Sequence, residues 1–168
     1  MNDIDWEQRL NEQIPNLRRY AMALTQDPTQ ADDLVQDSLE RAWDKRRTWR
    51  LDSNLRAWLF SIMHNTFVNS IRRNKLASDY AESLRQQQIQ AQEDTGYMIR
   101  DIHYALRQLR VEYREVVILA GLEGLSYKEI AQITDTPPGT VMSRLSRGRE
   151  ELRELLSEQK QAKVVPIK

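Results

Sequence analysis

The side chains best suited to chemistry in this sequence are arginines and hydroxyl residues that follow a double proline at Pro137-Pro138. Arginine can bind guanine through two hydrogen bonds or contact phosphate, and hydroxyl groups near a helix start can bind phosphate together with backbone amides. No acidic residue interrupts this segment before Glu150. The pattern is typical of a helix that contacts nucleic acid. Its candidate contacts are Thr140, Ser143, Arg144, Arg147 and Arg149.

The residues just before this segment predict the element that would position it. Ser126 and Glu129 have the spacing of a capping box, which starts a helix, and the small Ala131 stands where a second helix must approach closely. Asp135 occupies the turn position where glycine is commonest, and aspartate tolerates the left-handed conformation better than most residues. Prolines end the first helix and suit the first turn of the next. We therefore predict a helix-turn-helix.

Charge is unevenly divided along the N-terminal half, although the 25 basic and 25 acidic residues of the whole chain balance. From Asp27 to Asp44, six acids stand against one base; from Lys45 to Lys75, eight bases stand against one acid. This segregation predicts two partners, one basic and one polyanionic. The side chains predicted to form an exposed acidic face are Asp32, Asp33, Gln36, Asp37 and Glu40.

The basic stretch also carries the aromatic residues Trp49, Phe60 and His64. Capture of unstacked bases uses aromatic faces together with cationic contacts to the nucleic-acid backbone, so the stretch could bind single-stranded DNA. Two alternatives stay open. Trp49 could equally close the domain core, and Arg46-Arg47 could equally be a solvated helix end.

Apolar residues recur at three- and four-residue steps and show no alternating pattern, so the predicted fold class is all-α. Two small helical domains are expected at residues 1–75 and 97–157. Residues 76–96 are rich in Gln, Ser, Ala and acids and are expected to be a flexible linker. Residues 158–168 show no periodic apolar face and are expected to be a flexible tail.

Several function classes are excluded by composition. The chain has no cysteine, and its two histidines lack a nearby acidic cluster, so no metal site is expected. No grouping of nucleophile, base and orienting residue and no phosphate-binding glycine loop is present, so we expect neither an enzyme nor a cofactor. No segment has the roughly 18 apolar residues of a membrane span, and the polar start lacks a signal peptide's basic region. A soluble, cytoplasmic protein is expected.

Taken together, these segments resemble the extracytoplasmic-function group of the bacterial sigma-70 family, which carries only sigma regions 2 and 4. Ala31–Asp37 with Ala42-Trp43 is similar to regions 2.1 and 2.2, and Leu55–Phe60 through His64-Asn65 to Arg72-Arg73 is similar to regions 2.3 and 2.4. Gly124–Ala131 and Gly139–Val141, with Ser143, Arg144, Leu145 and Arg147, are similar to region 4.2.

The resemblance implies a promoter-specificity subunit of RNA polymerase. The acidic face would bind the beta-prime clamp helices, with the beta subunit, promoter DNA and an anti-sigma factor, possibly membrane-bound, as further partners. Region 4.2 would read the −35 element. Region 2 would open and read the −10 element through Trp49, Arg50, Asp52, Ser53, Asn54, Asn65, Asn69, Arg72 and Arg73.

Two positions depart from the family pattern, and two alternative functions stay open. Met142 stands where many members have a basic residue, and Ser146 stands where an aromatic is frequent, so the −35 sequence is not predicted.

One alternative is a conventional helix-turn-helix repressor or activator, which usually dimerises on half-sites about one DNA turn apart. The other is an adaptor that only sequesters a partner and does not promote transcription.

Overall fold

The computed structural model describes residues 3–78 and 97–163, which contain seven α-helices, one short 3-10 helix and no strand. This confirms the all-α prediction. The chain divides into two compact units. The first contains α1 to α3, and the second contains α4, α5, the larger part of α6, and α7.

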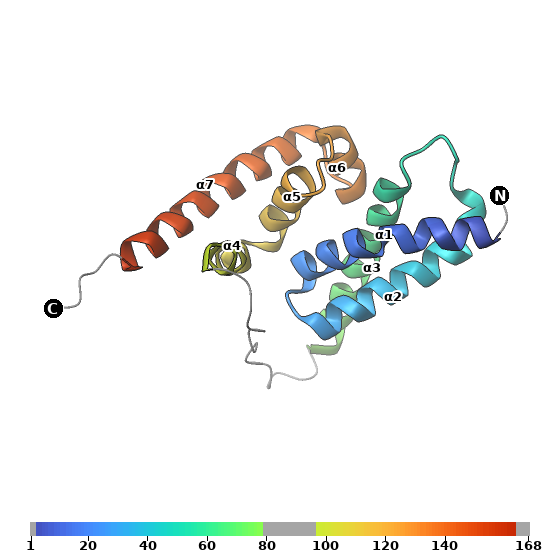
Figure 1. Cartoon of the computed structure of the whole chain (residues 1–168), viewed down its shortest axis with the longest axis horizontal. Coiled ribbons are helices and arrows are strands. Elements are labelled where there is room, and N and C mark those ends of the chain that lie inside the picture. The colour runs from blue at the N-terminus through green and yellow to red at the C-terminus, as the bar shows by residue number, and fades with distance from the viewer. Residues whose placement is uncertain (1–2, 79–96, 164–168) are drawn as a thin grey trace. The chain divides into compact units, whose positions relative to one another are not determined.

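The first unit is built from α1 (Asp3–Thr25), α2 (Pro28–Asp44), the 3-10 helix η1 (Arg46–Thr48) and α3 (Leu55–Ser78). Figure 1 shows α1 and α2 side by side with α3 crossing them, and each helix packs against the other two. The core is aromatic as well as aliphatic, because the Tyr20 and Phe60 rings are both fully buried with their centroids 4.8 Å apart.

The turn between α1 and α2 follows from three consecutive residues. Gln26 has a φ of +57°, which ends α1. The Asp27 carboxylate accepts a hydrogen bond from the Gln30 amide at 2.8 Å, and Pro28 occupies the first turn of α2. A side-chain cap followed by proline is a common way to start a helix.

Three tryptophans pack together at one end of the first unit. The Trp6 ring on α1 lies 5.5 Å from the Trp49 ring and 5.9 Å from the Trp58 ring on α3, measured between centroids. Trp6 and Trp49 are buried, and Trp58 is half-buried. This tryptophan cluster ties the start of α1 to the residue that precedes the η1–α3 loop.

The second unit contains α4 (Tyr97–Gln108), α5 (Val111–Gly121), α6 (Tyr127–Thr134) and the long α7 (Pro138–Lys163). The α7 helix packs against both α4 and α5, and its C-terminal end extends beyond them (Figure 1). A Cβ atom on Gly148 of α7 would lie 2.9 Å from Val117 Cγ2 and 3.2 Å from Tyr113 Cβ, both on α5. The missing side chain therefore sets how closely α5 and α7 approach.

Arg114 joins α4 to α5 from inside the second unit. Its guanidinium donates hydrogen bonds to the backbone carbonyls of Leu109 at 2.8 Å and Leu106 at 3.4 Å, at the C-terminal end of α4. A cation is favoured there because the helix dipole places negative charge at that end. Burial lowers the pKa of Arg114, and the nearby carboxylates of Glu112 and Glu115 oppose that shift.

Two helices continue further than the sequence predicted. α3 runs to Ser78, inside the segment 76–96 expected to be a linker, and α7 runs to Lys163, inside the expected tail. Residues 158–163 are therefore helical, although they belong to the segment expected to be a flexible tail. Glu, Gln, Ala and Lys dominate that stretch and are strong helix formers, and extending an existing helix adds a hydrogen bond per residue. Residues 79–96 and 164–168 lie outside the described residues.

Candidate nucleic-acid interface

The helix-turn-helix forms as its capping residues predict. The Glu129 amide donates to the Ser126 hydroxyl at 3.2 Å, and the Ser126 amide donates to the Glu129 carboxylate at 2.9 Å. Asp135 closes the turn with a φ of +50°. The Thr140 amide then bonds to the Pro137 carbonyl at 3.0 Å, so α7 begins at the second proline. The capping box, left-handed Asp135 and proline-started second helix are confirmed.

One side of α7 faces the interior, which fixes the side that faces out. Val141 and Leu145 are buried at 0 % and 2 % exposure, as their spacing predicts. Of the predicted contacts, Ser143, Arg147 and Arg149 are exposed, whereas Thr140 and Arg144 are half-buried. The Ser143 hydroxyl donates to the Thr140 carbonyl at 3.1 Å, which leaves its oxygen able to accept a hydrogen bond. Met142 and Ser146, the two positions that depart from the family pattern and were not among the predicted contacts, are also exposed on this outer side.

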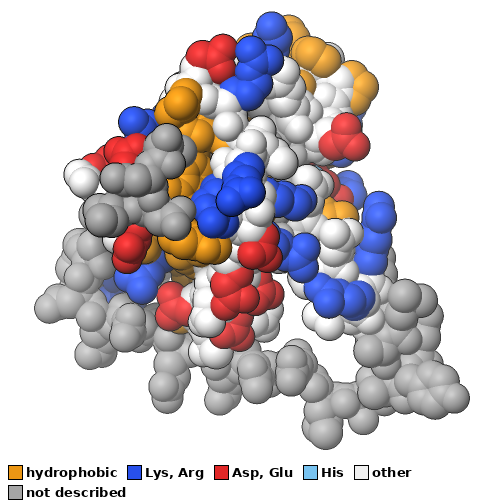
Figure 2. All heavy atoms as spheres, turned by 90° about the vertical axis from the view of Figure 1, so that its right-hand side faces the viewer, with side chains coloured by type: hydrophobic (Ala, Val, Ile, Leu, Met, Phe, Trp, Pro, Cys, Tyr) orange, Lys and Arg blue, Asp and Glu red, His pale blue; other side chains and the backbone are white. Residues whose placement is uncertain are grey.

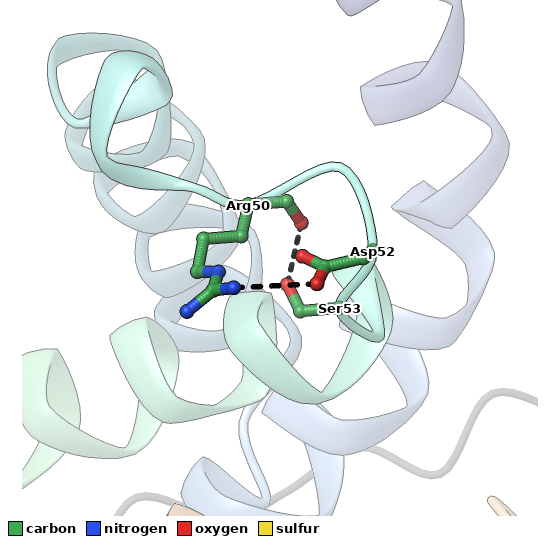
Figure 3. A network of polar contacts seen from close by, with 3 residues as sticks. All are labelled: Arg50, Asp52 and Ser53. Atoms are coloured by element: carbon green, nitrogen blue, oxygen red, sulfur yellow. Dashed lines mark hydrogen bonds and ion pairs between the residues drawn. The ribbon is translucent and has the colours of Figure 1, made fainter.

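The loop between η1 and α3 is a turn held by its own polar groups (Figure 3). The Ser53 hydroxyl and amide both donate to the Arg50 carbonyl, at 2.7 Å and 2.9 Å. Arg50 Nη2 lies 3.4 Å from Asp52 Oδ2, and both side chains are largely exposed. The Asn54 side-chain oxygen accepts from the Ala57 amide at 3.2 Å at the start of α3. The structure thus brings together four of the residues predicted to contact −10 DNA.

The remaining predicted −10 contacts lie further along α3. Asn65, Asn69, Arg72 and Arg73 are all exposed, and their three- and four-residue spacing places them on one face of the helix. Asn65 lies eleven residues beyond Asn54, which is about 16 Å along a helix axis. The loop and this face are therefore two separate groups of predicted contacts on one element.

Trp49 and Phe60 correct the sequence interpretation. Trp49 is 8 % exposed and packs on Trp6, and Phe60 is fully buried against Tyr20. Neither ring is open for a base to stack on. The alternative in which Trp49 closes the core describes its position, because an indole gains more from burial in the tryptophan cluster than from exposure to water.

The predicted acidic face is present on α2. The residues that α2 buries, among them Ala31, Leu34 and Val35, lie on the opposite side of the helix. Ser38 is also buried there, and its hydroxyl is satisfied by donating a hydrogen bond to the Leu34 carbonyl at 2.6 Å. The exposed residues, named here the acidic surface, are Asp32, Asp33, Gln36, Asp37 and Glu40. Figure 2 shows acidic side chains gathered beside one another on the visible face.

Within residues 3–78 and 97–163, no helix combines the length and apolar character that crossing a bilayer needs. The same residues contain no grouping of three or more His, Asp or Glu side chains that could hold a metal ion.

Comparison with known proteins identifies the family. Residues 10–64 match the family described as the Sigma2 domain of PhyR, and residues 99–152 match Sigma-70, region 4. The chain is 36 % identical over 149 residues to the ECF RNA polymerase sigma factor EcfG of Rhodopseudomonas palustris strain TIE-1, covering 85 % of this chain and 80 % of that protein. The chain belongs to the extracytoplasmic-function sigma factors. It is an RNA polymerase sigma factor that directs core polymerase to specific promoters and initiates transcription, and it is not itself an enzyme.

Two solved structures resemble this sigma factor over most of its length. The sigma factor RpoE, in complex with the anti-sigma factor NepR from Bartonella quintana, is 35 % identical with a TM-score of 0.81, covering 91 % of this chain and 97 % of that one. CnrH, in complex with the cytosolic domain of CnrY, is 25 % identical with a TM-score of 0.67, covering 94 % and 90 %. These similarities agree with the sigma-factor identification, and the alternative of a conventional repressor gains no support.

One basic residue has a structural role that the sequence left open. Arg46 Nη1 donates to the Trp43 carbonyl at 2.9 Å, and its guanidinium carbon lies 4.9 Å from the centroid of the Trp43 ring. Arg46 therefore folds back on the end of α2. The neighbouring Arg47 is exposed, so the two arginines have different surroundings and should be tested separately.

Proposed function

We propose that this sigma factor divides promoter recognition between its two units. The domain of residues 1–75 binds core polymerase and holds melted −10 DNA, and the domain of residues 97–157 binds −35 duplex, with residues 76–96 as the linker. The observation that carries this proposal is the two-sided α2 helix, which buries an apolar side in the core and leaves the acidic surface open to a partner.

The acidic surface is suited to a basic helical partner. Four of its five residues are acids, and their spacing along α2 keeps them on one side of a single helix. Only Asp32 has a nearby cation from another helix among the ion pairs of the described residues, and that contact to Arg18 is long, at 3.8 Å, and exposed. Complementary charge speeds association and selects the partner. The beta-prime clamp helices of polymerase are the partner that we infer.

The −10 contacts are assigned to the η1–α3 loop and to the exposed face of α3. The loop supplies an arginine, a carboxylate, a hydroxyl and an amide, which together can accept and donate hydrogen bonds to an unpaired base. Arg72 and Arg73 supply cations that can follow the phosphate backbone. Trp49 is left with an indirect role, holding the base of the loop against Trp6.

The polymerase contact is tested by reversing charge on the acidic surface. The double variant Asp33→Lys with Asp37→Lys should no longer co-purify with core polymerase. The matched control is Glu7→Lys with Glu12→Lys, which makes the same charge change at exposed positions of α1. If the acidic-surface variant binds polymerase as well as the control does, the acidic surface faces solvent and does not contact polymerase.

The −35 contact is tested on α7. Replacing the exposed Arg147 with Ala should weaken promoter binding by about 1–3 kcal/mol if its guanidinium binds a base edge. Arg144→Ala should also weaken binding, although Arg144 is half-buried and part of its effect would be lost packing. Arg153→Ala, an exposed arginine farther along α7, is the control. Unchanged promoter binding in both test variants would contradict this assignment.

An anti-sigma factor is the regulatory partner that we infer. The relatives in two solved structures are bound to NepR and to the cytosolic domain of CnrY. Whether the partner of this chain is membrane-bound stays a prediction, as does the cytoplasmic location that follows from working with polymerase and DNA. A purified anti-sigma candidate should compete with core polymerase for this sigma factor, and simultaneous binding of both would contradict an inhibitory role.

A further inference from the structure

Met142 is an apolar side chain on the outer side of the second helix of the helix-turn-helix. It is 54 % exposed, whereas α7 buries Val141, Leu145 and Gly148 on its inner side. Folding of the second unit therefore gains little from a large apolar residue here. Its position in the second turn of α7 is where such helices contact base edges.

The residues next to Met142 on the outer side of α7 do not cover its side chain. On a helix, residues four apart share a side, so Met142 aligns with Ser146, and Ser143 aligns with Arg147 next to it. Gly139, Ser143 and Ser146 are small and exposed, and none of them can cover a methionine side chain. The outer side of the first turns thus presents one uncovered apolar side chain, Met142, beside the polar and cationic side chains of Ser143 and Arg147.

This arrangement matches one feature of the major groove. Among the four bases, only thymine presents a methyl group there, and the other edges present hydrogen-bond donors and acceptors. The methionine side chain is flexible and polarisable, so it can adapt to a small apolar group. It has no hydrogen-bond donor and only a weak acceptor sulfur, so it offers little to a guanine or cytosine edge.

We propose that Met142 reads the C5-methyl group of a thymine in the −35 element, beside the base or phosphate that Arg147 contacts. The proposal rests on the proposed function of α7 in −35 binding. It names a specificity-determining residue at a position where the sequence departs from its family, and it replaces the missing basic side chain with an apolar contact.

The experiment uses the full chain bound to core polymerase. Promoter fragments are first selected from a random library, and each thymine of the selected −35 element is then replaced singly by deoxyuridine, which lacks only the methyl group. Wild-type holoenzyme should lose about fourfold in affinity at one thymine, the factor expected for one buried methyl group. Met142→Ala should bind thymine and deoxyuridine equally at that position, and Met142→Leu should retain most of the discrimination.

Met22→Ala is the matched control, because Met22 is an exposed methionine on α1. Met22→Ala should distinguish thymine from deoxyuridine as strongly as the wild type does. The proposal is overturned if wild type tolerates deoxyuridine at every position, if the selected element contains no thymine, or if Met142→Ala still discriminates. Failure of the proposed function would look different, because Arg147→Ala would then leave promoter binding unchanged.

Discussion

Replacing Gly148 with Ala tests whether the close approach of α5 and α7 sets the stability of the second unit. The added Cβ would lie 2.9 Å from Val117 Cγ2, 3.2 Å from Tyr113 Cβ and 3.3 Å from the Tyr113 carbonyl oxygen. Carbon atoms in favourable contact lie about 3.5–4.0 Å apart. Two of the three atoms cannot move without α5, because one is a backbone oxygen and the other is bonded to the backbone.

The expected magnitude is a balance of two opposing effects. Overpacking of a well-filled interior costs about 1–3 kcal/mol, and the stiff Val117 side chain in a helix can relieve little of it. Replacing a helical glycine by alanine stabilises a helix by about 1 kcal/mol. We therefore expect Gly148→Ala to lower the free energy of unfolding of the second unit by about 1 kcal/mol. For a unit of this size, that corresponds to a fall in Tm of about 5 °C.

The distribution of tryptophans allows the two units to be followed separately. All four tryptophans, at positions 6, 43, 49 and 58, belong to the first unit, so their fluorescence follows its unfolding alone. Far-ultraviolet circular dichroism follows the helices of both units. Gly148→Ala should lower the midpoint temperature of the second unit's transition seen by circular dichroism. It should leave the midpoint temperature of the fluorescence transition unchanged.

Gly121→Ala is the matched control, because no heavy atom lies within 4 Å of a Cβ at that position. It should not lower either transition. If Gly148→Ala is as stable as Gly121→Ala, the α5–α7 contact can absorb a methyl group and the packing argument is refuted. A shift in the fluorescence transition would also count against it.

Substitutions at three further positions test the helix-turn-helix and the α4–α5 contact by the same thermal-unfolding measurement. Ser126→Ala removes the cap of α6 and should destabilise by about 1 kcal/mol, whereas Ser157→Ala, whose hydroxyl bonds only to a carbonyl of its own helix, should have little effect. Arg114→Met leaves the Leu109 carbonyl without its charged donor and should cost about 2 kcal/mol; a change below 0.5 kcal/mol would show that water replaces the guanidinium. Asp135→Gly should stabilise by about 0.5 kcal/mol because it relieves a positive φ, and Asp135→Val should destabilise; equal effects would contradict the turn geometry.

The helices and their starts could be predicted because their signals are local. The α1–α2 turn and the capping box are each determined by residues close together in the sequence. The structure shows the side-chain hydrogen bonds that these residues are expected to make. Asp135 was predicted to tolerate the left-handed conformation and adopts it. The outer side of α7 also follows from local spacing, since Val141 and Leu145 must face inward.

The features that the sequence did not determine depend on distant contacts. An aromatic residue in a basic stretch has the same signature whether it binds DNA or fills a core, and only the position of Trp6 on α1 decides the question for Trp49. No sequence pattern predicted the structural role of Arg114, because the hydrogen bonds that join it to α4 go to backbone carbonyls, which every residue has. The continuation of α7 beyond residue 157 has no apolar pattern, and helix propensity with propagation from an existing helix produces it.

The two-sided α2 helix has a consequence for engineering new regulatory circuits. Its apolar residues hold the first unit together, while the acidic surface makes no contribution to the core, so the two sides can be changed independently. The charge pattern of the acidic surface could then be rewritten and matched by complementary changes in a polymerase. With the polymerase-binding role proposed for the acidic surface, a pair made in this way would transcribe its own promoters beside the native machinery, because the residues that hold the fold and those proposed to select the partner lie on opposite sides of one helix.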